Sequence, residues 1–349
     1  MSAASNLAFA APARARSESE RWEEWDRFVE AAPDAGFMQT SWWAEFRAMC
    51  GYRCFGVTIR DEGAIVGGAM VMKRFFDDRH GFYLICDGPL LPSDPECAKE
   101  VFSAVLAVLE KHRSAEDKIV AHLRIEPRWG QLPDFVNAFR ALPREGDRYA
   151  EPRDTIWIDL RPSMDEILEQ MKPKGRYNVR VAARHGVRVR EDMTAEGLES
   201  FLRIHAVTSA RHGLGGYSQS YFRTLLSMLQ VRRRLSIFFA EHEGTLLATA
   251  LVVFFGRRAT YFFGGSLAEQ RHTMAPYALH FEIMRRAKER GCEWYDLWGV
   301  DPAGTSGGFW HGISAFKRKL GGIEVNLPPT LDLVYESRGY ERFLQAARA

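Results

Sequence analysis

Two acidic residues stand at matching places in two copies of one short sequence block. Glu126 lies in Arg124–Pro127 and Asp301 lies in Gly299–Pro302, and a proline follows each of them directly. Polar groups at strand ends commonly face a cleft, where a carboxylate can accept or orient the proton of an amine. A helix cap or turn cap beside the proline is the alternative role, and the pattern leaves both roles open.

A basic segment suggests a second kind of chemistry. Positions 172 to 190 hold seven lysines or arginines and no acid. Three of the arginines are four residues apart, so they share one face of a helix. Such a face suits a polyanion, such as tRNA phosphates, a diphosphate or an anionic membrane surface, and a solvated basic face is the ordinary alternative. The candidate phosphate-binding residues are Lys172, Lys174, Arg176, Arg180 and Arg184.

Composition excludes some classes of chemistry. The histidines form no His-x-x-x-His pair, so we expect no metal site. The five cysteines are odd in number and are not spaced like a zinc knuckle, which is typical of reduced thiols in a cytosolic protein. A formal net charge of +2 says little about partners.

These residues are carried by a unit of sequence that occurs twice. Val57–Val71 is echoed by Phe238–Val252, and Phe82–Leu84 is echoed by Thr260–Phe262, ahead of the block that holds the two acids. Three blocks in the same order indicate one fold duplicated and fused, with a cleft between or beside the copies. With 349 residues and 46% hydrophobic side chains, two well-packed domains are expected. No stretch reaches the ~20 apolar residues that cross a bilayer.

Each half is predicted to be α+β, with an antiparallel hairpin followed by strand, helix and strand. In the second half, Ser163 and Glu166 form a predicted capping box, and a basic helix is expected to reach Gly186. Further helices are predicted at 22–31, 42–49, 95–113, 195–209, 220–229 and 276–290, and strands at 55–59, 65–72, 81–89, 119–125, 155–160, 236–255 (a hairpin), 259–264 and 294–300.

Domain boundaries follow from this order of elements. The chain starts with an Ala- and Ser-rich stretch that lacks a solid apolar run, which favours a flexible tail over a signal peptide. We expect this tail at 1–20, a first domain at 21–153, a second domain at 154–329, and a C-terminal segment at 330–349 that packs back onto the first domain.

Four motifs occur in order along the chain: Gln39–Trp42, the basic segment 172–186, Tyr295–Gly299 and Gly312–Gly322. Their order resembles that of the FemAB/FemX family of peptidoglycan-bridge aminoacyltransferases, over most of positions 22–343. The resemblance implies two tandem GNAT-like (acyl-CoA N-acyltransferase-like) domains with mixed sheets that form a channel. It also implies transfer of an amino acid from aminoacyl-tRNA to an amine of a peptidoglycan or other cell-envelope precursor. No cofactor is then needed besides the aminoacyl-tRNA cosubstrate.

The resemblance implies three catalytic residues. Lys317 would place a fixed positive charge beside the tetrahedral carbon, and Phe316 would shape the wall that holds the lysine. Spacing alone would make Lys317 one member of a solvated basic run, Phe316–Lys319. Glu126 is preferred over Asp301 as the group that accepts or orients the amine's proton, because similar compact enzymes have a carboxylate near that place.

The resemblance also implies substrate-binding residues in both halves. Arg47 lies one turn after Trp43, near a place where the family has a basic residue that contacts the precursor's diphosphate. Its alternative role is a surface arginine whose stem lies on Trp43. Two tyrosines match family residues that hydrogen-bond substrate, although buried tyrosines are more often core residues. The implied set is Arg47, Trp43, Tyr221, Tyr261 and Asp301.

The expected partners are aminoacyl-tRNA and a UDP-linked or lipid-linked muropeptide precursor. The expected location is the cytosol, with peripheral contact to the inner membrane if the acceptor is lipid-linked. One departure from the family widens the acceptor class. Gly215 and Tyr217 stand where compact members have a threonine and a phosphate-binding arginine, so another glycan-linked or peptide amine stays open as the acceptor.

Rival functions are distinguished by one loop. An acetyl-CoA-dependent N-acetyltransferase of polysaccharide or envelope biosynthesis needs a glycine-rich loop at a helix N-terminus to bind the pyrophosphate. Gln270–Ala275 occupies that place, but Thr273 stands where glycine is needed. A non-catalytic binding protein of an exopolysaccharide pathway is a second alternative, against which Lys317 and Tyr261 argue. A pure RNA-binding protein would leave the duplicated core unexplained.

Overall fold

The structure is a computed structural model in which the chain divides into two compact units. Unit 1 comprises Met1–Arg153 together with Leu327–Ala349, and unit 2 comprises Asp154–Asn326. Within the described residues, no helix combines the length and the apolar character that crossing a bilayer requires. The structure describes residues 18–33, 35–142, 151–213, 217–304 and 310–348.

Unit 1 is built on a mixed sheet whose described strands follow the order β1-β2-β3-β4-β13-β5. The first three strands form an antiparallel meander, β3 and β4 are parallel, and β13 pairs antiparallel with β4. The helix α3 connects the parallel strands. The elements are α1 (Glu18–Ala31), η1 (Phe37–Gln39), α2 (Ser41–Met49), β1 (Arg53–Asp61), β2 (Ala64–Phe75), β3 (His80–Cys86), α3 (Pro95–Ser114), β4 (Ile119–Glu126), η2 (Asp134–Val136), β5 (Arg140–Ala141), β13 (Leu331–Val334) and α10 (Ser337–Arg348).

The two faces of this sheet pack against different helices. On one face, Tyr83 is buried in a core cluster with the apolar side of α3. The next residue points the other way, and the ring of Phe82 lies 4.9 Å from that of Phe343 on α10. Arg124 on β4 forms two 2.8 Å hydrogen bonds with the carboxylate of Asp332 on β13, and both side chains are fully buried. The C-terminal segment therefore belongs to the core of unit 1.

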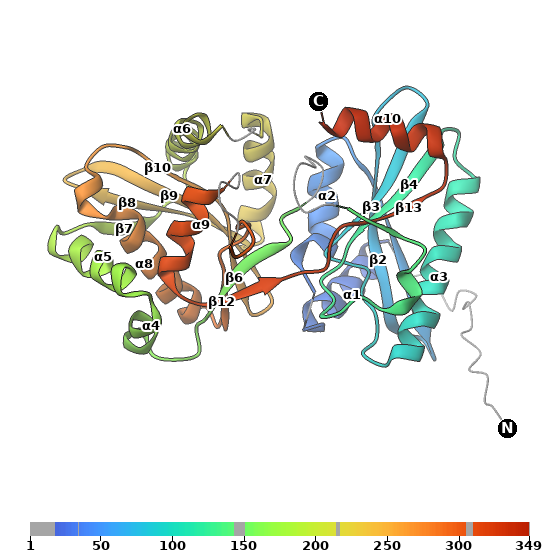
Figure 1. Cartoon of the computed structure of the whole chain (residues 1–349), viewed down its shortest axis with the longest axis horizontal. Helices are drawn as coiled ribbons and strands as arrows, with labels where there is room; N and C mark the ends of the chain where they lie inside the picture. The colour runs from blue at the N-terminus through green and yellow to red at the C-terminus, as the bar shows by residue number, and fades with distance from the viewer. Residues whose placement is uncertain (1–17, 34, 143–150, 214–216, 305–309, 349) are drawn as a thin grey trace. The chain divides into compact units, whose positions relative to one another are not determined.

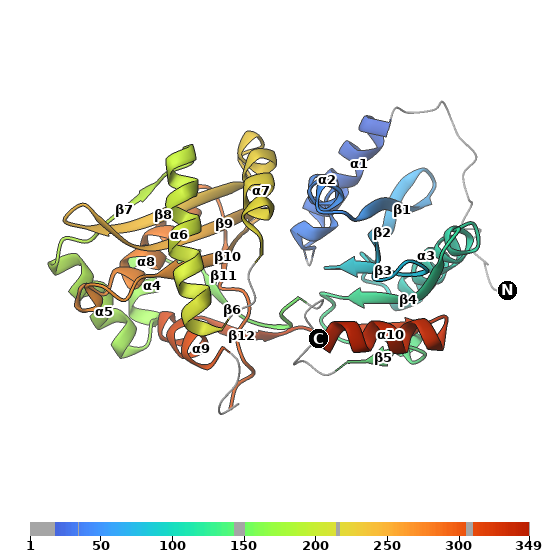
Figure 2. The ribbon, with the colours of Figure 1, turned by 90° about the horizontal axis from the view of Figure 1, so that it is seen from above.

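Unit 2 repeats this arrangement, with described strands in the order β12-β6-β11-β10-β9-β8-β7. The meander is β8, β9 and β10, and β11 runs parallel to β10 after the helix α8. Figure 1 shows α4, α5 and α8 on one side of this sheet and α6 and α7 on the other, and Figure 2 gives a second view. The elements are β6 (Asp154–Asp159), α4 (Met164–Gln170), α5 (Pro173–Arg184), β7 (Arg188–Glu191), α6 (Ala195–His212), α7 (Gln219–Val231), β8 (Leu235–His242), β9 (Thr245–Phe255), β10 (Arg258–Ser266), η3 (Arg271–Thr273), α8 (Ala275–Glu289), β11 (Trp294–Asp296), α9 (His311–Lys317), η4 (Arg318–Leu320) and β12 (Ile323–Asn326).

The two units share even a local irregularity, which supports the duplication read from the sequence. The register of the β1–β2 pair shifts between Ile59 and Arg60, and that of the β8–β9 pair shifts between Ala240 and Glu241. These positions coincide when the two repeated blocks are aligned. The predicted α+β fold with two tandem GNAT-like domains and mixed sheets is confirmed.

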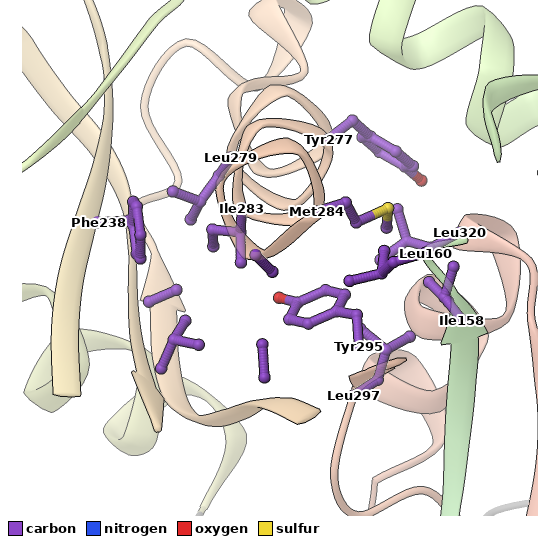
Figure 3. Packing of buried hydrophobic residues seen from close by; sticks show 14 of the residues in the cluster. Ile158, Leu160, Phe238, Tyr277, Leu279, Ile283, Met284, Tyr295, Leu297 and Leu320 are labelled. Carbon is purple, nitrogen blue, oxygen red and sulfur yellow. The ribbon is translucent and has the colours of Figure 1, made fainter. Parts of the chain in front are cut away.

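The core of unit 2 lies between α8 and its sheet, and it fixes the strand that leads to the candidate site. Ile283 and Met284 on α8 are buried together with Tyr295 on β11 and Leu297 just beyond it. Figure 3 shows these side chains pointing toward one another. This packing anchors β11 and therefore the start of the loop that follows it.

Two predicted strands end earlier than expected, for the same physical reason. The strand predicted at 294–300 has three residues, because Trp298 adopts φ 57°, a left-handed conformation that a strand cannot contain. The strand predicted at 81–89 ends before Asp87, which also adopts φ 57°. Each parallel pair is thus followed by a sharp change of chain direction.

Other differences concern short elements and the ends of segments. The basic helix expected to reach Gly186 ends at Arg184, and the last two arginines of the basic segment, Arg188 and Arg190, lie on β7. Residues 1–17 of the expected tail at 1–20 lie outside the described residues. The last three residues of that range belong to α1, which begins at Glu18. The capping box predicted for α4 is confirmed. Short strands such as β5, β7, β12 and β13 were not predicted, because two to four residues carry too little periodicity.

Candidate functional site

Lys317 ends the short helix α9 and is only 5% exposed. Its Nζ donates hydrogen bonds to the carbonyl oxygens of Gly299, at 2.7 Å, and of Trp298, at 3.4 Å, in the loop after β11. The ammonium group also lies 5.5 Å from the ring centroid of Tyr261 on β10. The lysine is therefore buried and anchored, and it does not belong to a solvated basic surface.

Burial changes the protonation of this lysine. Loss of hydration lowers the pKa of Lys317 to about 7, against the opposing fields of Asp296 and Asp301. On α8, burial and the nearby charge of Lys317 lower the pKa of His280 to about 3, so the imidazole is neutral. Its Nδ1 lies 2.8 Å from the hydroxyl oxygen of Tyr295. At neutral pH, Lys317 is thus poised between its charged and neutral forms.

Two aspartates shape the loop that accepts the lysine's hydrogen bonds. Asp296 Oδ1 accepts a 2.9 Å hydrogen bond from the backbone N–H of Trp298, which fixes the left-handed turn. Asp301 Oδ1 accepts a 3.1 Å bond from the N–H of Trp310, and the Asp301 N–H donates to Ser314 Oγ at 2.8 Å. These bonds tie the loop to α9. Asp301 therefore serves as a cap in this structure, and substrate binding by Asp301 stays a prediction.

Aromatic rings surround the lysine. The ring of Phe316 lies 5.0 Å from that of Tyr277 and 5.4 Å from that of His280. The ring of Tyr261 lies 4.6 Å from that of His280. A Cβ at Gly264 would approach the Tyr261 hydroxyl to 2.2 Å, so only glycine admits this tyrosine. The structure thus brings the predicted lysine, phenylalanine and tyrosine together.

A pocket of about 320 Å³ opens beside Phe316 within unit 2. This volume is in the range of pockets that hold small organic ligands. The lining combines apolar side chains with two arginines and one carboxylate, that of Glu269, and comes from α6, β9, β10, η3, α8, α9 and the loop before η3. Among the lining residues are Arg211, Gln270, Arg271, Met274, Tyr277 and Phe316.

The pocket lies at the start of α8. Met274 precedes this helix with φ 55°, and among the described residues no side chain caps the helix N-terminus. Pro276 has no N–H, and the N–H of Tyr277 donates to the carbonyl oxygen of Met274 at 2.9 Å, so the helix dipole is the main feature that favours an anionic group there. Thr273, which stands where a CoA-binding loop needs glycine, also lines the pocket and donates its hydroxyl to Gln270 O at 2.8 Å.

The predicted substrate residues on α2 are held inside unit 1. Trp43 is 1% exposed, and its ring packs 5.0 Å from Phe37 and 4.9 Å from Phe46. The guanidinium carbon of Arg47 lies 4.1 Å from the ring centroid of Tyr52 and 6.0 Å from that of Trp43. Arg47 is buried, so the alternative of a surface arginine does not fit. Its contact with a diphosphate stays a prediction.

Glu126 lies at the end of β4 and is completely buried. Its Oε1 accepts a 3.0 Å hydrogen bond from the backbone N–H of Glu151. Burial raises the pKa of Glu126, and burial together with the charge of Glu126 raises the pKa of Glu151. Arg153 opposes both shifts. This carboxyl has no exposed surface in the structure, and its role with an incoming amine stays a prediction.

Tyr221 on α7 lies in an aromatic cluster. Its ring stacks 4.2 Å from that of Tyr217, and lies 5.5 Å from Phe222 and 6.2 Å from Phe263. The tyrosine is buried, with 8% of its surface exposed. Hydrogen bonding from Tyr221 to substrate stays a prediction, and Gly215 lies outside the described residues.

The predicted phosphate-binding residues of the basic segment fall into two groups. Glu169 lies 3.0 Å from Arg180 and 3.7 Å from Arg176, so one carboxylate neutralises part of the arginine stripe. The other three side chains are exposed and form no ion pair among the described residues; they are Lys172, Lys174 and Arg184.

Sequence reasoning missed several residues that position the site. Asp296 lies inside the Tyr295–Gly299 motif, and that motif was the available signal. It also accepts a 2.6 Å hydrogen bond from Thr155 Oγ1 on β6, far away in the sequence. The sequence around His280 did not indicate a site residue, because His280 comes close to Lys317 only in the folded structure. The Gln39 side chain bonds backbone atoms of both β2 and β3, so this part of the first motif is structural.

Comparisons with known proteins agree with this fold. A family described as acetyltransferase (GNAT) domain matches residues 173–318. The chain is similar to lipid II:glycine glycyltransferases of Staphylococcus epidermidis and Staphylococcus aureus. Each is 22% identical to it, over 86% of this chain and 88% of the relative.

Solved structures of similar fold agree with these sequence matches. A crystal structure of FemX superposes with a TM-score of 0.81 at 19% identity, covering 92% of this chain and 97% of that chain. The structure of L-PGS from Bacillus licheniformis has a TM-score of 0.52 at 14% identity, with 93% and 95% covered. The chain therefore has the fold of FemX, and the resemblance to the Fem-type acyltransferases that its motifs predicted is confirmed.

Proposed function

We propose that the chain is a Fem-type acyltransferase that moves an aminoacyl group from aminoacyl-tRNA to an amine of a peptidoglycan precursor. The observation that carries this proposal is the pocket at the uncapped start of α8, which shares Phe316 with the surroundings of the buried Lys317. The relatives named lipid II:glycine glycyltransferase favour a lipid-linked precursor as the acceptor. Peripheral contact with the inner membrane would follow from such an acceptor.

The proposed reaction uses the charge of Lys317. The neutral acceptor amine attacks the carbonyl carbon of the aminoacyl ester, and the carbonyl oxygen becomes an oxyanion. The ammonium of Lys317 stabilises this oxyanion. The C–O bond to the RNA 3′ ribose then breaks, and the ribose oxygen leaves with the proton that the attacking amine has lost. A buried cation is effective here because few water molecules screen its field.

The predicted substrate residues keep their proposed places in this scheme. Tyr261, Tyr221 and Asp301 lie in unit 2, and we assign them to substrate binding there. Arg47 and Trp43 lie in unit 1, where Arg47 would bind the diphosphate of the precursor. Glu126 would accept or orient the proton of the amine, which requires the network around it to open.

The first experiment is transfer of label from a mixed pool of aminoacyl-tRNA to lipid-linked or UDP-linked muropeptide. We expect labelled muropeptide, and we expect ribonuclease treatment of the donor to abolish it. The identity of the labelled amino acid would define the donor. Muropeptide that stays unlabelled under all conditions would contradict the proposal.

Acetyl transfer from acetyl-CoA is the second candidate, since the matched family is described as an acetyltransferase (GNAT) domain. Thr273 argues against it, because its side chain stands where the CoA-binding loop needs glycine. A parallel reaction with labelled acetyl-CoA separates the two. Label that arrives only from acetyl-CoA would replace aminoacyl-tRNA as the donor.

A further inference from the structure

A row of cationic and aromatic side chains leads from the pocket to α5. Arg271 on η3 lines the pocket, and His272 follows it. The ring of His272 lies 5.2 Å from that of His185, the residue that caps the C-terminus of α5. The helix α5 itself packs on α8, as Figure 1 shows. The rim of the pocket therefore continues directly onto the end of α5.

The row continues along the exposed face of α5. The guanidinium carbon of Arg184 lies 5.8 Å from the ring centroid of Tyr177, and Tyr177 is 59% exposed. Lys174 lies one turn before Tyr177 and is exposed. Arg184 and Lys174 form no ion pair within the described part of the chain, whereas Arg180 is paired with Glu169. The cations that flank the exposed ring are therefore available to a ligand.

We propose that this row binds the phosphodiester backbone of an RNA whose 3′ end occupies the pocket. The inference rests on the proposed function, because it assigns the body of the donor to a defined surface. Cations would neutralise successive phosphates, and the exposed tyrosine ring would stack on an unpaired base or on the end of a stem. We call this surface the α5 track, and it consists of Arg271, His272, His185, Arg184, Tyr177 and Lys174.

The chemistry of the α5 track favours RNA over an anionic membrane. A membrane-binding helix face combines cations with several apolar side chains that enter the lipid. Tyr177 is the one large hydrophobic side chain exposed on α5, and its ring is covered on one side by Arg184. An exposed aromatic ring flanked by cations can instead stack on one base while the cations contact the neighbouring phosphates.

The test measures binding of the full chain to a fluorescent RNA hairpin with a short single-stranded 3′ end and no aminoacyl group. The triple variant Lys174→Gln/Tyr177→Ala/Arg184→Gln should bind about 50-fold more weakly at low salt. Because two cations are lost, the slope of log K against log salt should fall by about 1 to 2. Tyr177→Ala alone should weaken binding about tenfold and leave the slope unchanged.

The matched control removes the same charge elsewhere in unit 2. Arg223→Gln/Arg257→Gln replaces two exposed arginines that are paired with Glu199 and Glu293, and it should leave RNA affinity within about twofold. Equal losses in the triple variant and the control would overturn the inference. So would a wild-type chain that binds phosphatidylglycerol vesicles but not the RNA. The RNA probe carries no aminoacyl group, so this binding test does not depend on catalysis. If the chain binds the RNA but transfers no aminoacyl group in the separate transfer assay, the proposed function is contradicted and the α5 track is still supported.

Discussion

The helices α3 and α8 occupy the same place in the two units, yet they begin differently. In unit 1, the carboxylate of Asp94 accepts a 2.9 Å hydrogen bond from the N–H of Cys97 and so caps α3. In unit 2, Met274 gives α8 no such cap among the described residues, and a pocket borders the helix start. One copy caps its helix with its own carboxylate, whereas the N-cap residue of the other makes no side-chain cap hydrogen bond.

A second difference lies beyond the parallel strand of each unit. After β4, Glu126 joins a buried network with Glu151 and Arg153. After β11, the loop at Trp298 holds the buried ammonium of Lys317. Since Phe316 lies beside the surroundings of that lysine and also lines the pocket, we propose that the donor site lies in unit 2.

The largest effect is expected from Lys317→Met, which removes the charge that we propose to stabilise the oxyanion. Turnover should fall about 10²- to 10³-fold in the transfer assay, while binding of the donor stays near the wild-type value. Lys319→Met is the matched control, because it removes a neighbouring lysine of the same run. Its turnover should stay close to wild type, and an equal loss in both variants would remove Lys317 from its special role.

The pH dependence of Lys317→Arg provides the next test. The pKa of Lys317 is about 7, so the wild type loses the required charge as the pH rises above 7, whereas an arginine keeps it. The ratio of the variant's rate to the wild-type rate should therefore rise about tenfold per pH unit above 7. Ionisation of the acceptor amine affects both rates equally, so it does not change their ratio. A ratio that falls with pH would mean that the neutral lysine acts as a base.

The comparison of the two helix starts can be tested by exchanging their charges. Met274→Asp places a carboxylate at the start of α8, as unit 1 has at α3, and aspartate tolerates the left-handed conformation there. We expect the KM for the anionic donor to rise about tenfold, with little change in kcat. Met274→Asn is the uncharged control. Asp94→Ala should lower stability by about 1 kcal/mol and leave transfer unchanged.

The smallest expected effect concerns stability. The folded-state pKa of Lys317 lies below the value of an exposed lysine, so the unfolded chain binds the extra proton between those two values and wild-type stability should rise with pH above 7. Below pH 7 the full cost of the buried charge is present. Linkage should stabilise the wild type by about 4 kcal/mol between pH 6 and pH 10, so Lys317→Met should be the more stable protein at pH 6, by about 2 kcal/mol once its lost hydrogen bonds are counted, and the less stable one at pH 10. Equal unfolding curves at both pH values would show that burial does not shift this lysine.

The sequence predicted most of the fold because its long elements have clear periodicity and clear boundaries. The hairpins and the helices α3 and α8 fall close to their expected ranges. The strand at 294–300 was predicted too long, since no residue type signals a left-handed tryptophan at position 298. The pairing of β13 with β4 joins segments about 200 residues apart, which no local pattern reveals.

The candidate site was less predictable than the fold. Lys317 came from a family motif, whereas its burial, its lowered pKa and its anchoring to Gly299 depend on three-dimensional packing. The sequence also did not indicate that Trp43 and Glu126 are buried inside unit 1. The pairing of Glu169 with part of the basic stripe also appears only in the folded structure.

The most direct test of the donor assignment is photocrosslinking. A nonhydrolysable aminoacyl-tRNA analogue with a photoreactive aminoacyl side chain would be irradiated with the full chain, and the labelled peptides identified by mass spectrometry. We predict label on peptides that contain Phe316 or the pocket-lining stretch 266–277 of unit 2, and loss of label with excess tRNA. Label on the start of α3 in unit 1, or competition by acetyl-CoA and not by tRNA, would contradict the account.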